Sequence, residues 1–427
     1  MASNNISLLS SETRVEVPYI KVTIGQYTFG TYGQTTATKT AEGFSNAVSI
    51  MYPNYVKSLS IQKINGQVNQ YTLTLIYPVT PTDDPNFFEK VFSSVSDSRK
   101  IIFSYGDMKL PKYIYKDEQA LITNIRSNFE IKSHTITYVV SAVSSAALAA
   151  YSVDTFNNQG RKKPSSEIYR IIFHEPKYGL QDIFYGMKSE EQARQNKLIP
   201  EDDAEVVLET KQNISVLDYL KYLVSCMRPD SAIASQKDSG EVYALKIIDD
   251  ATNTTDKDGI EYGGPYIKIE LVSKAKLNSE AYEIDIGFPT SNIVTQFNVE
   301  NDESYSIYYD WQSKLNENTY VRRLNNDGLW EDVYAPSISS KNDKCETRPQ
   351  DLNWWTKVTE YPITATITIK GLLRPAILMT YVRLNVYFYG QKHINSGLYI
   401  VTKQLDTIDA RGYRTQLSLT RIAGDTQ

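Results

Sequence analysis

The chain has 427 residues, of which 41% are hydrophobic and 22% charged, and its formal net charge is −5. This composition is typical of a soluble protein with room for several domains, and the charge argues against a chain that grips nucleic acid through many phosphates. No apolar run approaches the roughly 20 residues of a membrane span. Residues 1–14 are polar, are expected to be flexible, and lack the pattern of a signal peptide.

Tyrosine is unusually frequent, with 32 residues against 13 Phe and 4 Trp. Tyrosine favours strands and is enriched at protein interfaces. Two interpretations stay open: a protein that forms interfaces, or a β-rich chain that uses Tyr in place of Phe. Both favour a β-rich structural or binding protein.

The first 150 residues predict strands and one helix. Alternation and turn residues predict a strand pair over 15–30, a hairpin over 55–79, a strand at 100–107 and a long hairpin at 120–144. Between them, an apolar stripe that includes Phe88 and Val91 predicts a helix. Asp83 or Asp84 is its expected cap, and Pro85 suits its first turn.

The middle of the chain predicts mixed structure. Residues 151–165 are expected to be a polar linker, and 166–187 a helical start followed by irregular structure. A helix capped by Ser215 follows. Strands are expected at 241–250 and 264–272. The Tyr-rich stretch 301–353 is either a docking surface or a cover over the middle region.

The final stretch, Ser396–Arg421, predicts the best-patterned hairpin of the chain. Its first strand has apolar Leu398, Ile400, Leu405 and Ile408, and its second strand alternates strictly after a turn near Gly412. The 120–144 hairpin has a similar pattern, which predicts one β-domain shape used twice.

Catalytic and metal-binding motifs are not found. The histidines His134, His174 and His393 are isolated, and Cys226 and Cys345 have no metal-ligand spacing. We therefore predict no catalytic residue, cofactor or metal, and no enzymatic activity.

Acidic and aromatic groups leave weaker alternatives. The loop with Asp256, Asp258 and Glu261 only loosely resembles a calcium loop. Glu190–Glu191 and Glu201–Asp203 are carboxylate groups that a hydrolase would need in a cleft. Trp354–Trp355 suits sugar stacking or a buried anchor, so a carbohydrate-binding β-sandwich module on a virion or cell surface is the alternative function.

The C-terminal motifs resemble those of tail or baseplate hub proteins of tailed phages and related contractile injection systems. They are Pro362–Ala365, Thr368–Gly371, Ser396–Val401, and Gly412–Thr415 followed by Leu417, Leu419 and Arg421. The helix after Ser215 is similar to the inserted domain of such hubs. The resemblance covers most of the chain in layout, but only about the last 70 residues in motif.

That resemblance implies a structural virion protein of the tail or baseplate, synthesised in the host cytoplasm. It implies a homotrimer that adapts a six-fold tail tube to a three-fold spike, with tail tube protein, spike protein and other baseplate proteins as partners. Long hairpins would line a conduit through which DNA passes at genome ejection without sequence-specific binding. A net charge of −5 is consistent with a wall that does not trap phosphates.

The predicted fold class is mainly β with α insertions (α+β): two tube-like β-barrel or sandwich domains and a mixed middle domain. The expected division is a first β-domain at 15–150, a linker at 151–165, a middle domain at 166–283, a β-rich docking region at 284–353 and a second β-domain at 354–427. The predicted interface residues are Tyr399, Tyr413, Arg414, Arg421, Ile136, Tyr138, Trp354 and Trp355.

Overall fold

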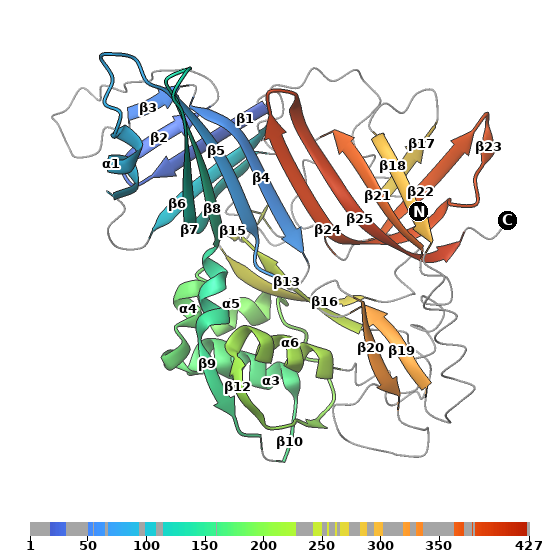
Figure 1. Cartoon of the computed structure of the whole chain (residues 1–427). Coiled ribbons are helices and arrows are strands. Elements are labelled where there is room, and N and C mark those ends of the chain that lie inside the picture. Colours follow the sequence, from blue (N-terminus) through green and yellow to red (C-terminus); the bar gives the residue numbers. More distant parts are fainter. Residues whose placement is uncertain are drawn as a thin grey trace.

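The computed structural model describes residues 18–30, 50–53, 55–64, 67–93, 99–107, 114–158, 160–227, 242–249, 254–255, 261–262, 265–272, 282–287, 294–301, 319–324, 330–335, 363–370, 378 and 381–424. Most of these residues lie in strands. One large sheet contains strands from both the N-terminal and the C-terminal part of the chain. This confirms the predicted class, mainly β with α insertions. Figure 1 shows a first β region (blue to teal), a second β region (yellow to red) and a helical middle region (green).

The first β region is an almost entirely antiparallel sheet with the order β4-β5-β8-β7-β6-β1-β2-β3. Its strands are β1 (Pro18–Ile24), β2 (Tyr27–Gly30), β3 (Ile50–Pro53), β4 (Val56–Ile64), β5 (Gln70–Pro78), β6 (Lys100–Asp107), β7 (Tyr115–Glu130) and β8 (Thr135–Ser144). Buried residues alternate with half-buried ones along β8, as the period of a strand with one covered face requires. The hairpins predicted at 55–79 and 120–144 are therefore confirmed.

Helix α1 (Phe87–Ser93) covers one face of this sheet, which confirms the predicted helix. Asp84 accepts a hydrogen bond from the Asn86 backbone N–H just before the helix begins. The Phe88 side chain is fully buried, and its ring lies 5.1 Å from that of Tyr138 on β8. Burial of one such side chain contributes roughly 2–3 kcal/mol, so this contact is a main reason why the short helix stays on the sheet.

The second β region has the order β18-β21-β25-β24, and β22 pairs with β24, β17 and β23. Its strands are β17 (Tyr282–Ile286), β18 (Val294–Asn301), β21 (Ile363–Lys370), β22 (Tyr381–Phe388), β23 (Gln391–Lys392), β24 (Gly397–Asp409) and β25 (Gly412–Gly424). The hairpin β24–β25 is the one predicted at 396–421. Strands β17 and β18 precede the expected start of the second β-domain at 354, yet they belong to its sheet.

The middle region has a hydrophobic core of its own, built around α6 (Val216–Cys226). The other helices are α2 (Leu148–Tyr151), α3 (Pro164–Tyr169), a π-helix (Arg170–His174), a 3-10 turn (Pro176–Tyr178), α4 (Leu180–Ile183) and α5 (Glu190–Gln195). The Ser215 side chain accepts a hydrogen bond from the Asp218 backbone N–H, so the predicted cap is confirmed. Residues 166–187 are helical for most of their length, whereas the sequence predicted irregular structure after the first turn.

Short strand pairs complete the described structure. They are β9 (Val153–Phe156) with β12 (Lys211–Ser215), β10 (Arg161–Lys162) with β11 (Val206–Val207), β13 (Val242–Ile248) with β16 (Tyr266–Val272), β14 (Thr254–Thr255) with β15 (Glu261–Tyr262), and β19 (Thr319–Leu324) with β20 (Trp330–Ala335). The segment predicted as a linker thus contributes β9 and β10 to the middle region. Among the helices described here, none is long and apolar enough to span a membrane.

Candidate functional site: the junction of the two β regions

Strand β24 joins the two β regions because it changes partner along its length. Residues Gly397–Ile400 pair with β22 of the second region, and Lys403–Ile408 pair with β4 of the first region. The register against β25 shifts between Val401 and Lys403. An extra residue of this kind bends and twists a strand, which allows β24 to leave one sheet and continue into the other (Figure 1).

The hairpin β24–β25 consequently belongs to two hydrophobic cores. Near its base, Tyr399, Val401 and Leu417 pack in the core of the second region. Near its turn, Ile408 and Tyr413 are fully buried in the core of the first region. Because separating the regions would expose both of these side chains, the hairpin holds them as one body.

A buried ion pair lies beside this junction. The Nζ atom of Lys63 on β4 lies 3.3 Å from Oε1 of Glu118 on β7, and the Glu118 side chain is fully buried. The hydroxyls of Tyr71 and Tyr105 donate to the same carboxylate at 2.8 and 3.0 Å. Burial, followed by the charge of Glu118, raises the pKa of both Tyr71 and Tyr105 well above the usual value, so both hydroxyls keep their protons and remain donors.

Lys63 also faces aromatic rings and a second carboxylate. Its Nζ lies 4.5 Å from the centre of the Tyr115 ring, a cation–π contact that partly compensates for lost hydration. Its charge also acts on Asp406 of β24. The charge of Lys63 therefore acts on a carboxylate of each β region, Glu118 in the first and Asp406 in the second. Removing one partner of such a buried pair costs about 3–5 kcal/mol.

Asp406 is fully buried, and its carboxylate accepts hydrogen bonds from residues of its own hairpin. The Thr415 Oγ1 donates to Oδ1 at 2.6 Å, and the Gln404 Nε2 donates to Oδ2 at 2.7 Å. Burial raises the pKa of Asp406 to about 6, against the opposing effects of Lys63 and of the hydrogen bonds from Thr415, Gln404 and Tyr413. The junction thus carries a carboxyl group that titrates near neutral pH.

The burial pattern of β4 carries one signal of this network. Leu59, Ile61 and Lys63 share the buried face of β4, so Lys63 occupies a core position of the strand. On β24 the sequence predicted Leu405 as an apolar position. Leu405 is only half-buried, and Gln404 and Asp406 are buried instead. The bulge at Thr402 reverses which residues face inward, and alternation alone does not reveal a bulge.

The same bulge occurs in both long hairpins. In β7 the register against β8 shifts between Ile122 and Asn124, and in β24 it shifts between Val401 and Lys403 against β25. The residue inside each shift is a threonine. Thr123 Oγ1 donates to the Ser141 carbonyl at 3.1 Å, and Thr402 Oγ1 donates to the Ser418 carbonyl at 3.1 Å. Thr123 and Ser141 of the first hairpin are therefore equivalent to Thr402 and Ser418 of the second.

Polar contacts also tie the first β region to the middle region. The hydroxyl of Ser144, at the end of β8, donates to Asp249 Oδ1 at 2.5 Å, and both residues are buried. Ser144 Oγ also accepts from the Ala146 backbone N–H where the chain enters the helices. The long hairpin is thereby anchored at its base.

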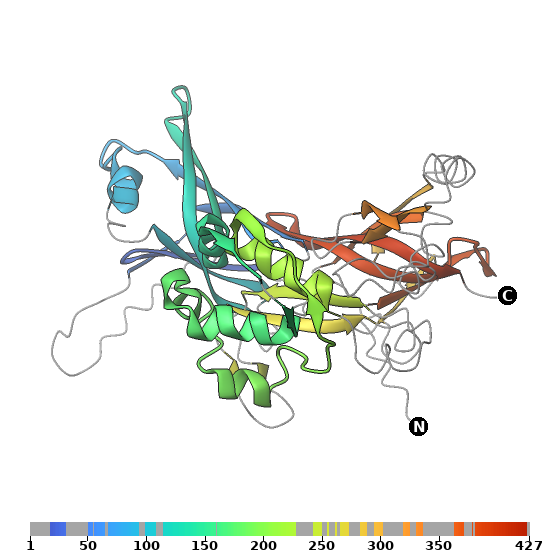
Figure 2. The ribbon, with the colours of Figure 1, turned by 90° about the horizontal axis from the view of Figure 1, so that it is seen from below.

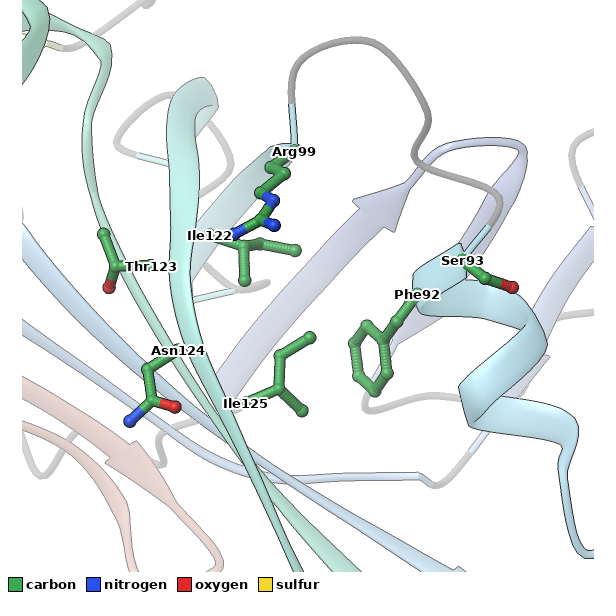
Figure 3. A pocket seen from close by; sticks show the side chains of 7 residues that line it. All are labelled: Phe92, Ser93, Arg99, Ile122, Thr123, Asn124 and Ile125. Carbon is green, nitrogen blue, oxygen red and sulfur yellow. The ribbon is translucent and has the colours of Figure 1, made fainter.

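A pocket of about 570 Å³ opens where β7 passes its bulge (Figure 3). Phe92 of α1 and Ile125 of β7 point toward one another across it, and Arg99 and Ile122 line its other end. The remaining lining residues are Ser93, Thr123 and Asn124. The pocket therefore adjoins the half of β7 that extends beyond the rest of the sheet.

Four of the predicted interface residues have buried side chains. Tyr399 and Tyr413 are fully buried in the junction hairpin, and Ile136 and Tyr138 are buried in the core of the first β region. The Tyr138 hydroxyl donates to Glu89 Oε1 at 2.8 Å. Contact of these four residues with another chain stays a prediction. Because their side chains are buried, exposed residues beside them would have to make that contact.

The other predicted interface residues differ in their placement. Arg414 is half-exposed and donates to Asp409 Oδ2 at 2.8 Å. Arg421 donates to the backbone carbonyls of Ile394 and Ser396 at 2.9 and 3.0 Å. Trp354 and Trp355 lie outside the described residues, as does Trp311 of the Tyr-rich stretch.

The acidic groups considered for hydrolysis are engaged in structural contacts. Glu190 and Glu201 both bond to Arg194. Asp203 accepts hydrogen bonds from the Ser165 backbone and side chain, and Asp202 accepts one from Tyr243 at 2.6 Å. Asp256 and Asp258 lie outside the described residues. Within the described part of the chain, no group of three or more His, Cys, Asp or Glu side chains is placed to hold a metal ion.

Comparisons with known proteins give matches only at the level of structure. No family model matches the chain, and no curated protein matches it. The chain is similar to a tail protein from Neisseria meningitidis MC58, with 9% identity, a TM-score of 0.48 and coverage of 95% of this chain and 96% of the other. It is also similar to a 43 kDa tail protein of prophage MuSo2 from Shewanella oneidensis, with 11% identity, a TM-score of 0.44 and coverage of 96% and 100%.

A prophage tail protein, gp18, from Listeria monocytogenes EGD-e has 7% identity and a TM-score of 0.38, with coverage of 86% of this chain and 89% of the other. All three solved structures are tail proteins of phage or bacterial origin, and phage tail proteins are the class that the C-terminal motifs resemble.

Proposed function

We propose that this protein is a structural tail hub whose two β regions are consecutive segments of a ring wall. The observation that carries the proposal is the junction at β24. The second β region continues into the first by strand pairing, and the two regions share one hairpin design with the same threonine bulge. Repeats joined head to tail generate a closed ring when further copies continue the same rotation.

The expected assembly is a homotrimer, in which three copies of two β regions give a pseudo-six-fold wall. Such a ring would adapt a six-fold tail tube to a three-fold spike, with the tube and spike proteins as partners. DNA would pass through the ring without sequence-specific binding, and the net charge of −5 supports passage over trapping. The protein would act in the virion tail or baseplate and catalyse no reaction.

We propose the domain division that the sequence predicts, with one change at the start of the second β-domain. Strands β17 and β18 are assigned to the second β-domain because they pair with β22 and β21. The middle domain is built around α6 and is anchored to the first β region through Ser144 and Asp249. The role of 301–353 as a docking region stays a prediction.

Light scattering on the purified chain and electron microscopy test this function. We expect a mass three times that of the 48.5 kDa chain and a ring with three-fold or pseudo-six-fold symmetry. A protein that stays monomeric at high concentration and forms no ring with tube or spike proteins would contradict the proposal. Glycan binding lost on Trp354→Ala would favour the carbohydrate-binding alternative.

A further inference from the structure

The outer half of β7 is an exposed sheet edge. Residues 115–121 pair with β6, but within the described structure residues 124–130 pair only with β8, and Thr123 before them lies in the bulge. All eight are exposed, including Ile125 and Phe129, and the hairpin β7–β8 extends beyond its sheet in Figure 2. A long edge with apolar side chains is a template for another strand.

The corresponding half of β24 is not free. Strand β24 pairs with β22 up to Ile400, passes its bulge and then pairs with β4. The order β4-β5-β8-β7 in the first region matches the order β18-β21-β25-β24 in the second. Strand β18 is therefore the equivalent of β4, and it ends its sheet, with β21 as its only strand partner in the described part of the chain.

We propose that the exposed edge of β7 in one copy pairs with β18 of a second copy, repeating the β24–β4 junction between chains. This inference rests on the proposed ring, and it adds the strands and the register. Figure 1 places β7 and β18 in different β regions of one chain, so the contact is heterologous. The β18 strand of a second copy pairs with β7 of the first, and the β7 edge of that second copy is then available to the next chain.

The register follows from pairs within the chain. Ser141 and Ser418 both accept from the bulge threonine, and their neighbours across the sheet are Thr72 and Thr366. The next neighbours are Ser60 and Asn298. These steps make Asn298 the equivalent of Ser60.

Ser60 pairs with Thr407, which lies five residues after the bulge of β24. The residue at the same distance from the bulge of β7 is Asn128. Asn128 of one copy is therefore expected opposite Asn298 of the next.

The neighbouring pairs in this register are chemically complementary. Two residues before Asn128, Arg126 falls opposite Glu300, and one residue after it, Phe129 falls opposite Phe297. Opposite charges and aromatic pairs directly opposite each other across antiparallel strands stabilise the pairing. Both Arg126 and Glu300 are exposed in the single chain. Neither pair entered the derivation of the register, so their fit is independent support.

A cysteine crosslink in the full-length chain tests the register. The variant Asn128→Cys with Asn298→Cys, purified and mildly oxidised, should give a ladder ending at a covalent trimer on non-reducing electrophoresis. The matched control Asn128→Cys with Gln296→Cys moves one thiol by two residues and should crosslink far less. Each single variant should give no covalent trimer and so account for the native cysteines.

Charge reversal supplies a second readout that does not depend on thiols. Arg126→Glu and Glu300→Arg should each lower the trimer fraction in light scattering, and the double variant should restore it. A wild-type trimer without crosslinking at 128 and 298, and without rescue in the double variant, would overturn the inference and leave the proposed ring standing. A wild-type chain that stays monomeric would overturn both.

Discussion

Asp406 offers the sharpest test of the junction. The substitution Asp406→Asn keeps the size of the side chain and removes its titration. The amide still has an oxygen for the Thr415 hydroxyl, and the Gln404 amide can rotate to accept from the new NH₂ group. Any cost of the altered hydrogen bonds is independent of pH, so the pH-dependent part of the difference reports the carboxyl group.

The magnitude follows from the pKa. Burial raises the pKa of Asp406 from 3.8 to about 6. Each unit corresponds to 1.36 kcal/mol, so the charged form in the folded chain is unfavourable by about 3 kcal/mol. Because the folded-state pKa is the higher one, this group destabilises the fold least below pH 4 and most above pH 6.

We expect the free energy of unfolding of Asp406→Asn, minus that of the wild type, to rise by about 2.5 kcal/mol between pH 4 and pH 8, because part of the full change lies below pH 4, where the unfolded carboxyl begins to ionise. Denaturant titrations at several pH values measure this difference. Hydrogen exchange of the β24 and β4 amides measures it at the junction itself. The groups facing Asp406 that also carry charge or titrate are Lys63, Tyr105 and Tyr413, with Glu118 beyond Lys63.

Parallel curves for Asp406→Asn and the wild type from pH 4 to 8 would refute the reasoning, because they would mean that no group at this site titrates near 6. Asp83→Asn is a control of opposite sign. Hydrogen bonds from the Thr80 side chain and backbone lower the pKa of the exposed Asp83. Asp83 therefore contributes stability above its unfolded pKa that is lost as the pH falls through its folded pKa.

Three further predictions concern other parts of the fold. Glu118→Gln should lower the free energy of unfolding by about 3–5 kcal/mol because it removes the carboxylate that lies 3.3 Å from the buried ammonium of Lys63, and adding Lys63→Met should recover much of the loss in the same denaturation assay. Ser215→Ala should cost about 1 kcal/mol through the lost helix cap, and Ser215→Thr, which keeps the hydroxyl that accepts from the Asp218 backbone N–H and donates to the Asp218 carboxylate, should cost little. Gly287→Ala should destabilise the β17–β22 contact, since a Cβ would lie 2.1 Å from the Tyr387 carbonyl oxygen at a positive φ; unchanged thermal stability would contradict this.

The sequence by itself determined the local elements of this protein. Alternation fixed the hairpins β4–β5, β7–β8 and β24–β25, because a strand with one buried face must repeat every two residues. Ser215 marked the start of α6, because a cap acts within one helical turn. The similar pattern of the two long hairpins also predicted a repeated design, which the matching bulges now support.

Only the tertiary structure decided how these elements are joined. The change of partner along β24, the Lys63–Glu118 pair and the placement of β18 depend on residues far apart in the chain, and local periodicity carries no information about such pairing. The bulge at Thr402 decides which side chains of β24 face inward, and so makes Asp406 a core residue. Four predicted interface residues proved to be buried for a related reason: alternation identifies a strand's apolar face but not what covers it.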